Sequence, residues 1–268
     1  MLWKRVLTAA VLLPPLAGAV IYGKGWPFAL LVGTVTLLCA GEYFRLFFPA
    51  ARDRRSGVVV TGLVYLLGTL LPWPAAGAAV LCGVALAAFS FLAGGGSSPA
   101  EKARGAALTA LGAVYIGGFL STYPRTIALP AGEHWILLGL VAVFAGDTFA
   151  YFVGKAFGKR PLSPAISPNK TVEGSLGGLA ASVLLGSGYA ALFLSGVPPW
   201  FALLASAVVG VAGQAGDLFE SLLKRAAGVK DSGTLLPGHG GMLDRVDAVI
   251  AAGPALYLFA LLVPYAKG

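Results

Sequence analysis

Long apolar runs separated by short polar segments dominate the chain. Each run holds roughly 15 to 23 residues, which is about the length that an α-helix needs to cross the ~30 Å hydrocarbon layer of a bilayer. We therefore predict an all-α, polytopic integral membrane protein with about nine transmembrane helices. The predicted spans are residues 6–22, 26–44, 57–71, 75–93, 106–124, 135–154, 173–195, 199–220 and 246–266.

The overall composition supports a membrane location. Only 11% of the 268 residues are charged and 57% are hydrophobic, with a mean hydropathy of +0.83. A soluble domain of this size exposes far more charge. The composition therefore excludes an ordinary soluble enzyme or binding domain.

The positions of the basic residues predict the orientation of the chain. Lys and Arg gather in the cytoplasmic loops of membrane proteins. If the N-terminus is cytoplasmic, 16 of the 19 basic residues lie on the inner side, and only Lys24, Arg125 and Lys267 lie outside. The net charge of +8 is then explained by topology and anionic lipid, so nucleic acid is not an expected partner. We expect a bacterial inner membrane protein whose charged motifs face the cytoplasm.

Acidic residues are rare, and their distribution is uneven. Four of the 11 lie in the first half of the chain, and among these Glu42 is expected to pair with Arg45 three residues later. The other seven lie in the second half, where carboxylates within membrane spans are costly and point to function. They are Asp147, Glu173, Asp217, Glu220, Asp231, Asp244 and Asp247.

Helical spacing places several of these carboxylates on common faces. Asp217, Glu220, Ser221, Lys224 and Arg225 form one stripe if the eighth span continues as a helix. The pair Asp244 and Asp247 and the series Asp147, Tyr151 and Lys155 also have helical spacing. Such charges either neutralise one another as buried ion pairs or form a site, and seven carboxylates exceed what pairing alone requires.

Carboxylates from separate helices beside Lys and Arg suit a Mg²⁺ site that carries phosphates. Mg²⁺ takes one or two protein carboxylates and completes its shell with phosphate oxygens and water, while Lys and Arg neutralise the remaining phosphate charge. Gly233, Gly238, Gly240 and Gly241 surround Pro237 and His239. The backbone amides of such a loop can approach an anion closely.

Residues 221–247, SLLKRAAGVKDSGTLLPGHGGMLDRVD, resemble the signature of the phosphatidate cytidylyltransferases, or CDP-diacylglycerol synthases. A second region agrees with this family through Gly146-Asp147, Gly154-Lys155, Gly158-Lys159, Ser167 to Thr171 and Glu173-Gly174. The resemblance covers roughly residues 144 to 250. It implies transfer of CMP from CTP to phosphatidate, giving CDP-diacylglycerol and pyrophosphate. It also implies Mg²⁺, allows a second cation such as K⁺, and suggests a homodimer.

The resemblance also implies roles for individual residues. Asp244 and Asp217 are expected as metal ligands, with Asp247 and Asp147 completing or supporting that centre. The expected phosphate partners are Lys224, Arg225, Lys230 and Arg245. Further substrate contacts are expected from Ser167, Lys170, Thr171, Ser221 and Lys155. His239 either donates to a phosphate or holds its loop, and Asp231 and Glu220 either orient basic residues or touch metal.

Several alternatives remain open from the sequence. Residues 1–100 are predicted to be a lipid-facing scaffold, and residues 101–268 to be the catalytic region. Gly177, Gly178, Gly213 and Gly216 mark either close helix packing or broken helices that line a cavity. A CTP-dependent lipid kinase and a non-enzymatic carrier with carboxylates in the membrane are the competing functions.

Overall fold

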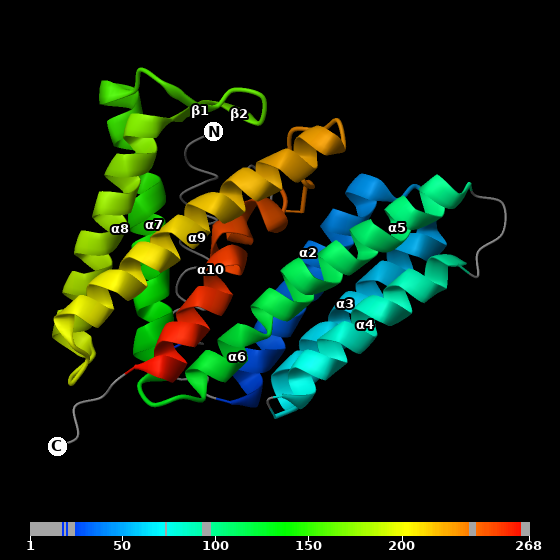
Figure 1. The fold of residues 1–268 in the computed structure, drawn as a ribbon, viewed down its shortest axis with the longest axis horizontal. Helices are drawn as coiled ribbons and strands as arrows, with labels where there is room; N and C mark the ends of the chain where they lie inside the picture. Colours follow the sequence, from blue (N-terminus) through cyan, green and yellow to red (C-terminus); the bar gives the residue numbers. More distant parts are fainter. Residues whose placement is uncertain are drawn as a thin grey trace. The chain divides into compact units, whose positions relative to one another are not determined.

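The computed structural model describes residues 18, 20, 25–72, 74–92, 98–235 and 240–263. Helices cover nearly all of these residues (Figure 1), and each predicted span from the second to the ninth overlaps a helix within the described residues. The first predicted span, 6–22, lies almost entirely outside the described residues. The helices are α2 (Trp26–Phe47), α3 (Ala51–Leu70), α4 (Ala75–Leu92), α5 (Pro99–Gly112), the π-helix η1 (Ala113–Gly118), α6 (Thr122–Ile127), α7 (Gly132–Phe157), α8 (Val172–Phe193), α9 (Pro199–Ala226) and α10 (Leu243–Leu262).

Six helical segments within the described residues are long and apolar enough to cross a membrane. They are α2, the continuous segment Pro99–Ile127, α7, α8, α9 and α10. The prediction of a helical integral membrane protein is therefore confirmed. The count of nine spans and the cytoplasmic N-terminus stay predictions.

A short β-hairpin departs from the all-α expectation. Strands β1 (Pro161–Ser163) and β2 (Ser167–Thr171) pair antiparallel between α7 and α8. The Glu173 carboxylate accepts hydrogen bonds from the backbone N–H groups of Lys159 and Arg160, at 3.1 and 3.2 Å. A side chain at the start of α8 thus holds the entry of the hairpin, and the hairpin delivers Lys170 to the site described below.

Contacts between residues divide the chain into two units. The first unit comprises Met1–Arg125 and Asp231–Arg245, and the second comprises Thr126–Lys230 and Val246–Gly268. Part of the signature, from Asp231 to Arg245, therefore folds with the N-terminal helices. The assignment of a scaffold role to residues 1–100 and a catalytic role to residues 101–268 stays a prediction.

In the first unit, buried aromatic side chains of α2 pack directly on glycines. A Cβ atom at Gly57 of α3 would lie 2.4 Å from the Phe44 ring, and one at Gly112 of α5 would lie 2.6 Å from the Tyr43 ring. The Tyr43 hydroxyl also donates to the Leu108 carbonyl at 2.9 Å. These contacts fix the rotation of α2 about its axis, and with it the direction of the neighbouring Glu42.

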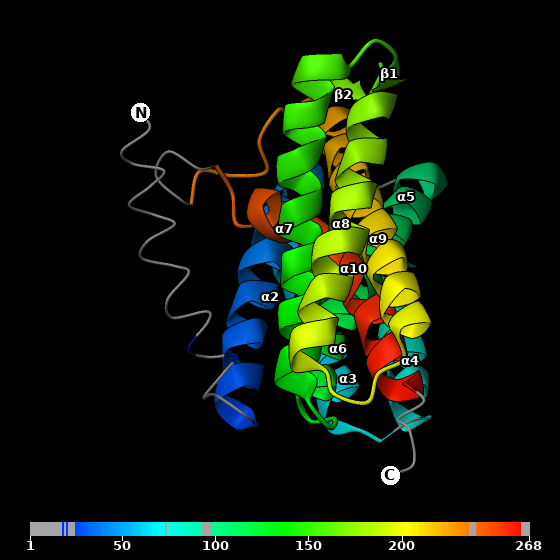
Figure 2. The same ribbon diagram turned by 90° about the vertical axis from the view of Figure 1, so that its left-hand side faces the viewer.

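In the second unit, α7, α8 and α9 lie side by side (Figure 2), and glycines allow their close approach. A Cβ atom at Gly178 of α8 would lie 2.6 Å from the Gly146 carbonyl of α7, and one at Gly177 would lie 2.7 Å from Val153. A Cβ atom at Gly213 of α9 would lie 3.2 Å from the Val143 side chain. Helices α8 and α9 run unbroken through these positions. Close packing is thus confirmed, and the idea of helices broken at these glycines is wrong.

Candidate active site

Three helices of the second unit contribute carboxylates that interact electrostatically. Asp147 lies on α7, Asp217 on α9 and Asp247 on α10. The charge of Asp217 repels those of both Asp147 and Asp247, and Asp147 also repels Asp247. Asp247 is only 9% exposed, and its Oδ1 accepts a hydrogen bond from the Ala248 N–H at 2.8 Å. A concentration of negative charge of this kind requires cations nearby.

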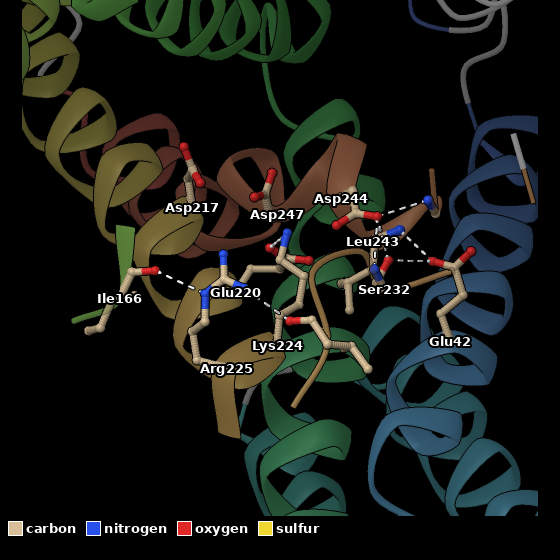
Figure 3. Close-up of polar contacts among 12 residues, drawn as sticks. Glu42, Ile166, Asp217, Glu220, Lys224, Arg225, Ser232, Leu243, Asp244 and Asp247 are labelled. Atoms are coloured by element: carbon tan, nitrogen blue, oxygen red, sulfur yellow. Dashed lines mark hydrogen bonds and ion pairs between the residues drawn. The ribbon is translucent and has the colours of Figure 1, made fainter. Parts of the chain in front are cut away.

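Two lysines supply part of that positive charge. The Lys170 Nζ of β2 lies 2.5 Å from Asp217 Oδ2 and also attracts Asp147. The Lys224 Nζ lies 2.5 Å from Glu220 Oε2, with side chains that are 14% and 1% exposed, and it attracts Asp247. The continuous helix α9 therefore confirms the predicted stripe, and Figure 3 shows Lys224 meeting Glu220 within it.

Arg225 ties the end of α9 to the β-hairpin. Its Nε donates to the Ile166 carbonyl at 3.3 Å (Figure 3), and its Nη1 donates to the Val229 carbonyl at 3.2 Å. Thr171 ends the hairpin and caps α8, because its Oγ1 accepts from the Gly174 N–H at 3.1 Å. Arg225 and Thr171 thus have structural partners, and their predicted substrate contacts stay predictions.

The donor chemistry of the second-unit carboxylates fits a hard cation. No group of three or more His, Cys, Asp or Glu side chains lies close enough to hold a metal ion in the part of the chain that the structure describes. Mg²⁺ usually takes only one or two protein carboxylates and receives its other ligands from phosphate and water. The Lys170 ammonium beside Asp217 occupies a position where positive charge is favourable. The residues present therefore suit Mg²⁺, while the assignment of Asp147, Asp217, Asp244 and Asp247 as its ligands stays a prediction.

A second polar cluster lies in the first unit, where Glu42 of α2 meets the loop before α10 (Figure 3). Glu42 Oε1 accepts from the Met242 N–H at 2.9 Å, and Oε2 accepts from the Leu243 N–H at 2.8 Å and from the Ser232 hydroxyl at 3.1 Å. The Glu42 side chain is buried, whereas Arg45 is exposed. The expected pairing of Glu42 with Arg45 is therefore wrong, because the carboxylate turns to the loop.

The same loop holds the carboxylate of Asp244. Asp244 Oδ2 accepts from the Ser232 N–H at 3.0 Å, the Ser232 hydroxyl at 2.9 Å and the Gly241 N–H at 2.8 Å. Asp244 and Asp247 both lie on α10, three residues apart as predicted. The structure thus gives Asp244 a fixed orientation within its own unit.

The remaining predicted site residues lie in different settings. Lys230 and Arg245 are exposed, Ser167 and Ser221 are half-buried, and Asp231 is exposed. The Lys155 Nζ lies 5.9 Å from the centre of the Tyr151 ring. His239 falls outside the described residues. None of these positions by itself assigns a substrate contact.

Sequence reasoning missed the parts played by Glu42 and Ser232. A signal for Glu42 was present, since a carboxylate near the end of an apolar run must find partners. Its partners lie 190 to 201 residues further along the chain, and no local pattern identifies them.

Comparison with known proteins gives the family of the chain. A profile of the Cytidylyltransferase family matches residues 3–263. A phosphatidate cytidylyltransferase of Synechocystis sp. is 32% identical in an alignment that covers 97% of each chain. Phosphatidate cytidylyltransferases of Bacillus subtilis and Mycobacterium bovis are 43% and 36% identical. Those two alignments cover 57% and 64% of this chain and only 57% and 56% of the relatives. Since both the profile and one relative extend over nearly all of its length, the chain belongs to the Cytidylyltransferase family.

Proposed function

We propose that the protein transfers CMP from CTP to phosphatidate, forming CDP-diacylglycerol and pyrophosphate. One observation carries the proposal: three helices of an integral membrane protein carry Asp147, Asp217 and Asp247 near enough to interact electrostatically, and Lys170 forms an ion pair with Asp217. This combination suits a polyphosphate with its cation at the membrane surface. The names and the family of the relatives support the same activity.

The reaction needs positioning and charge neutralisation rather than a protein nucleophile. A phosphate oxygen of phosphatidate attacks the α-phosphorus of CTP, and the bond from that phosphorus to the oxygen bridging to the β-phosphorus breaks. The electron pair leaves with pyrophosphate, and the new phosphorus–oxygen bond joins CMP to the lipid phosphate. Lys170, Lys224, Arg225, Lys230 and Arg245 are proposed to bind the phosphates of CTP and lipid and to bring them together.

The aspartates are proposed to hold Mg²⁺, with Asp217 and Asp244 as ligands and Asp247 and Asp147 in support. Bound Mg²⁺ would neutralise the polyphosphate and the pyrophosphate leaving group. A divalent cation at Asp217 would compete with the Lys170 ammonium for this carboxylate. Lys170 would then be available to bind a phosphate. A second cation such as K⁺ at this centre is part of the proposal.

The membrane placement is also proposed. With nine spans and a cytoplasmic N-terminus, the signature faces the cytoplasm of a bacterial inner membrane, as the distribution of basic residues favours. CTP then arrives from the cytoplasm, while phosphatidate keeps its acyl chains in the bilayer. A homodimer is the proposed assembly.

One labelling experiment separates this function from its competitors. Purified protein in detergent with Mg²⁺ receives CTP labelled at its α-phosphate or at its γ-phosphate, together with phosphatidate or diacylglycerol. Label from the α-phosphate alone should enter lipid, only with phosphatidate, and pyrophosphate should appear in equal amount. Label from the γ-phosphate in lipid would instead identify a kinase. No labelled lipid under any condition would reject both enzymes and favour a carrier.

A further inference from the structure

Glu42 is the one buried carboxylate among the described first-unit residues that spans from a membrane helix to the signature loop. It is 4% exposed. Its two oxygens accept hydrogen bonds from the N–H groups of Met242 and Leu243 at the start of α10. N–H groups at a helix start have no carbonyl partner within that helix. A carboxylate at a helix N-terminus also interacts favourably with the helix dipole. Glu42 therefore stabilises the first turn of the helix that carries Asp244.

A single hydroxyl connects Glu42 to Asp244. Ser232 Oγ lies 3.1 Å from Glu42 Oε2 and 2.9 Å from Asp244 Oδ2. Two carboxylates that share one hydroxyl proton repel each other unless other donors neutralise them. The backbone N–H groups of Ser232, Gly241, Met242 and Leu243 supply those donors.

The loop backbone packs on the Glu42 carboxylate without side chains between them. A Cβ atom at Gly241 would lie 2.4 Å from Glu42 Oε2, and one at Gly233 would lie 2.7 Å from Glu42 Oε1. Gly240 has a φ of +79°, which a residue with a side chain rarely adopts. The glycines of the signature thus have a physical purpose here, since they let the loop close on Glu42.

We propose that Glu42 is a positioning residue for the transfer reaction: it holds Ser232, Met242 and Leu243 of the signature in place, and through Ser232 it sets the direction of the Asp244 carboxylate. The inference rests on the proposed function of Asp244 as a ligand of the catalytic cation. Glu42 itself need not touch substrate or metal. Its effect on catalysis passes through Ser232 and the first turn of α10.

The test compares Glu42→Gln with Arg45→Gln in the full-length protein. Glu42→Gln keeps the size of the side chain but replaces an acceptor oxygen by an NH₂ donor that faces an N–H or hydroxyl donor. Arg45→Gln removes an exposed charge three residues from Glu42 on the same helix, and it tests the discarded pairing. Arg45→Gln should match the wild type in every measurement below.

Two readouts are required. Hydrogen exchange of peptides covering residues 232–244 should be roughly tenfold faster in Glu42→Gln than in the wild type, while exchange in α7 is unchanged, because the opening is local. In the CTP and phosphatidate assay, kcat should fall by about tenfold to a hundredfold, the effect of a misplacement near 1 Å. The Mg²⁺ concentration for half-maximal rate should rise, and the KM for phosphatidate should stay unchanged.

Ser232→Ala guards against the chance that Glu42→Gln fails to fold. It removes the shared hydroxyl but keeps both backbone contacts of Glu42, and it should reproduce the altered Mg²⁺ dependence. Unchanged exchange of the loop, or an unchanged Mg²⁺ dependence in both variants, overturns the proposal. If the wild type forms no CDP-diacylglycerol, the proposed function fails, and the exchange experiment still decides whether Glu42 holds the loop.

Discussion

The contact of α9 with α10 at Gly216 gives the sharpest test of how packing supports the site. An added Cβ at this position would lie 2.4 Å from the Ala251 Cβ and 2.7 Å from the Asp247 carbonyl oxygen. Neither atom can rotate away, since one is the first atom of a side chain and the other is backbone. To reach an ordinary contact of about 3.4 Å, the two helices must separate locally by about 1 Å.

The expected cost of Gly216→Ala follows from two opposed effects. Overpacking a close contact costs roughly 1–3 kcal/mol, and replacing a helical glycine by alanine returns up to about 1 kcal/mol. The net loss is about 0–3 kcal/mol. At about 2–4 °C per kcal/mol for a chain of this size, it lowers Tm by at most about 12 °C. Catalysis should suffer far more, because a 1 Å shift of Asp247 relative to Asp217 lowers kcat by about a hundredfold.

Gly188→Ala is the matched control for this substitution. Gly188 lies within α8, and a Cβ atom there would meet nothing within 4 Å. Turnover of labelled CTP and Tm in detergent are measured for both variants. The control should keep wild-type turnover, and adding Ala251→Gly to Gly216→Ala should restore part of the lost rate. Wild-type kcat in Gly216→Ala would refute the claim that this contact sets the carboxylate geometry.

Three further outcomes are expected. Lys224→Met should lower the free energy of unfolding by roughly 3–5 kcal/mol, because it removes a cation from the buried Glu220 carboxylate. Adding Glu220→Met should restore Tm without restoring turnover. Recovered turnover in the double variant would assign Lys224 a purely structural role. Lys170→Met should lower the Mg²⁺ concentration for half-maximal rate, since it frees the Asp217 carboxylate. It should also raise the KM for CTP or phosphatidate, since it removes a phosphate partner. An unchanged Mg²⁺ titration would contradict the competition between Lys170 and Mg²⁺ for Asp217. Asp244→Asn should abolish turnover in protein that still inserts and purifies normally, and chelation of Mg²⁺ should do the same to the wild type; retained activity would remove Asp244 from the metal centre.

Local features of the sequence determined the helical class, the polar stripe on α9 and the family. The helical class follows from apolar runs of membrane length, because each helix satisfies its own backbone hydrogen bonds within the bilayer. The stripe from Asp217 to Arg225 follows from helical spacing and is confirmed by the continuous α9. The family follows from the signature at residues 221–247 and is confirmed by the match over residues 3–263.

Other features were decided only by the tertiary structure. The β-hairpin brings Lys170 to Asp217, although 47 residues separate them in the sequence. The sequence left open whether the glycines of α8 and α9 serve packing or break the helices, and their contacts with neighbouring helices show that they serve packing. The sequence favoured Arg45 as the partner of Glu42, whereas in the structure Glu42 accepts hydrogen bonds from Ser232, Met242 and Leu243 of the signature. Spacing along a helix predicts which residues share a face, but it does not specify which distant backbone donors that face will meet.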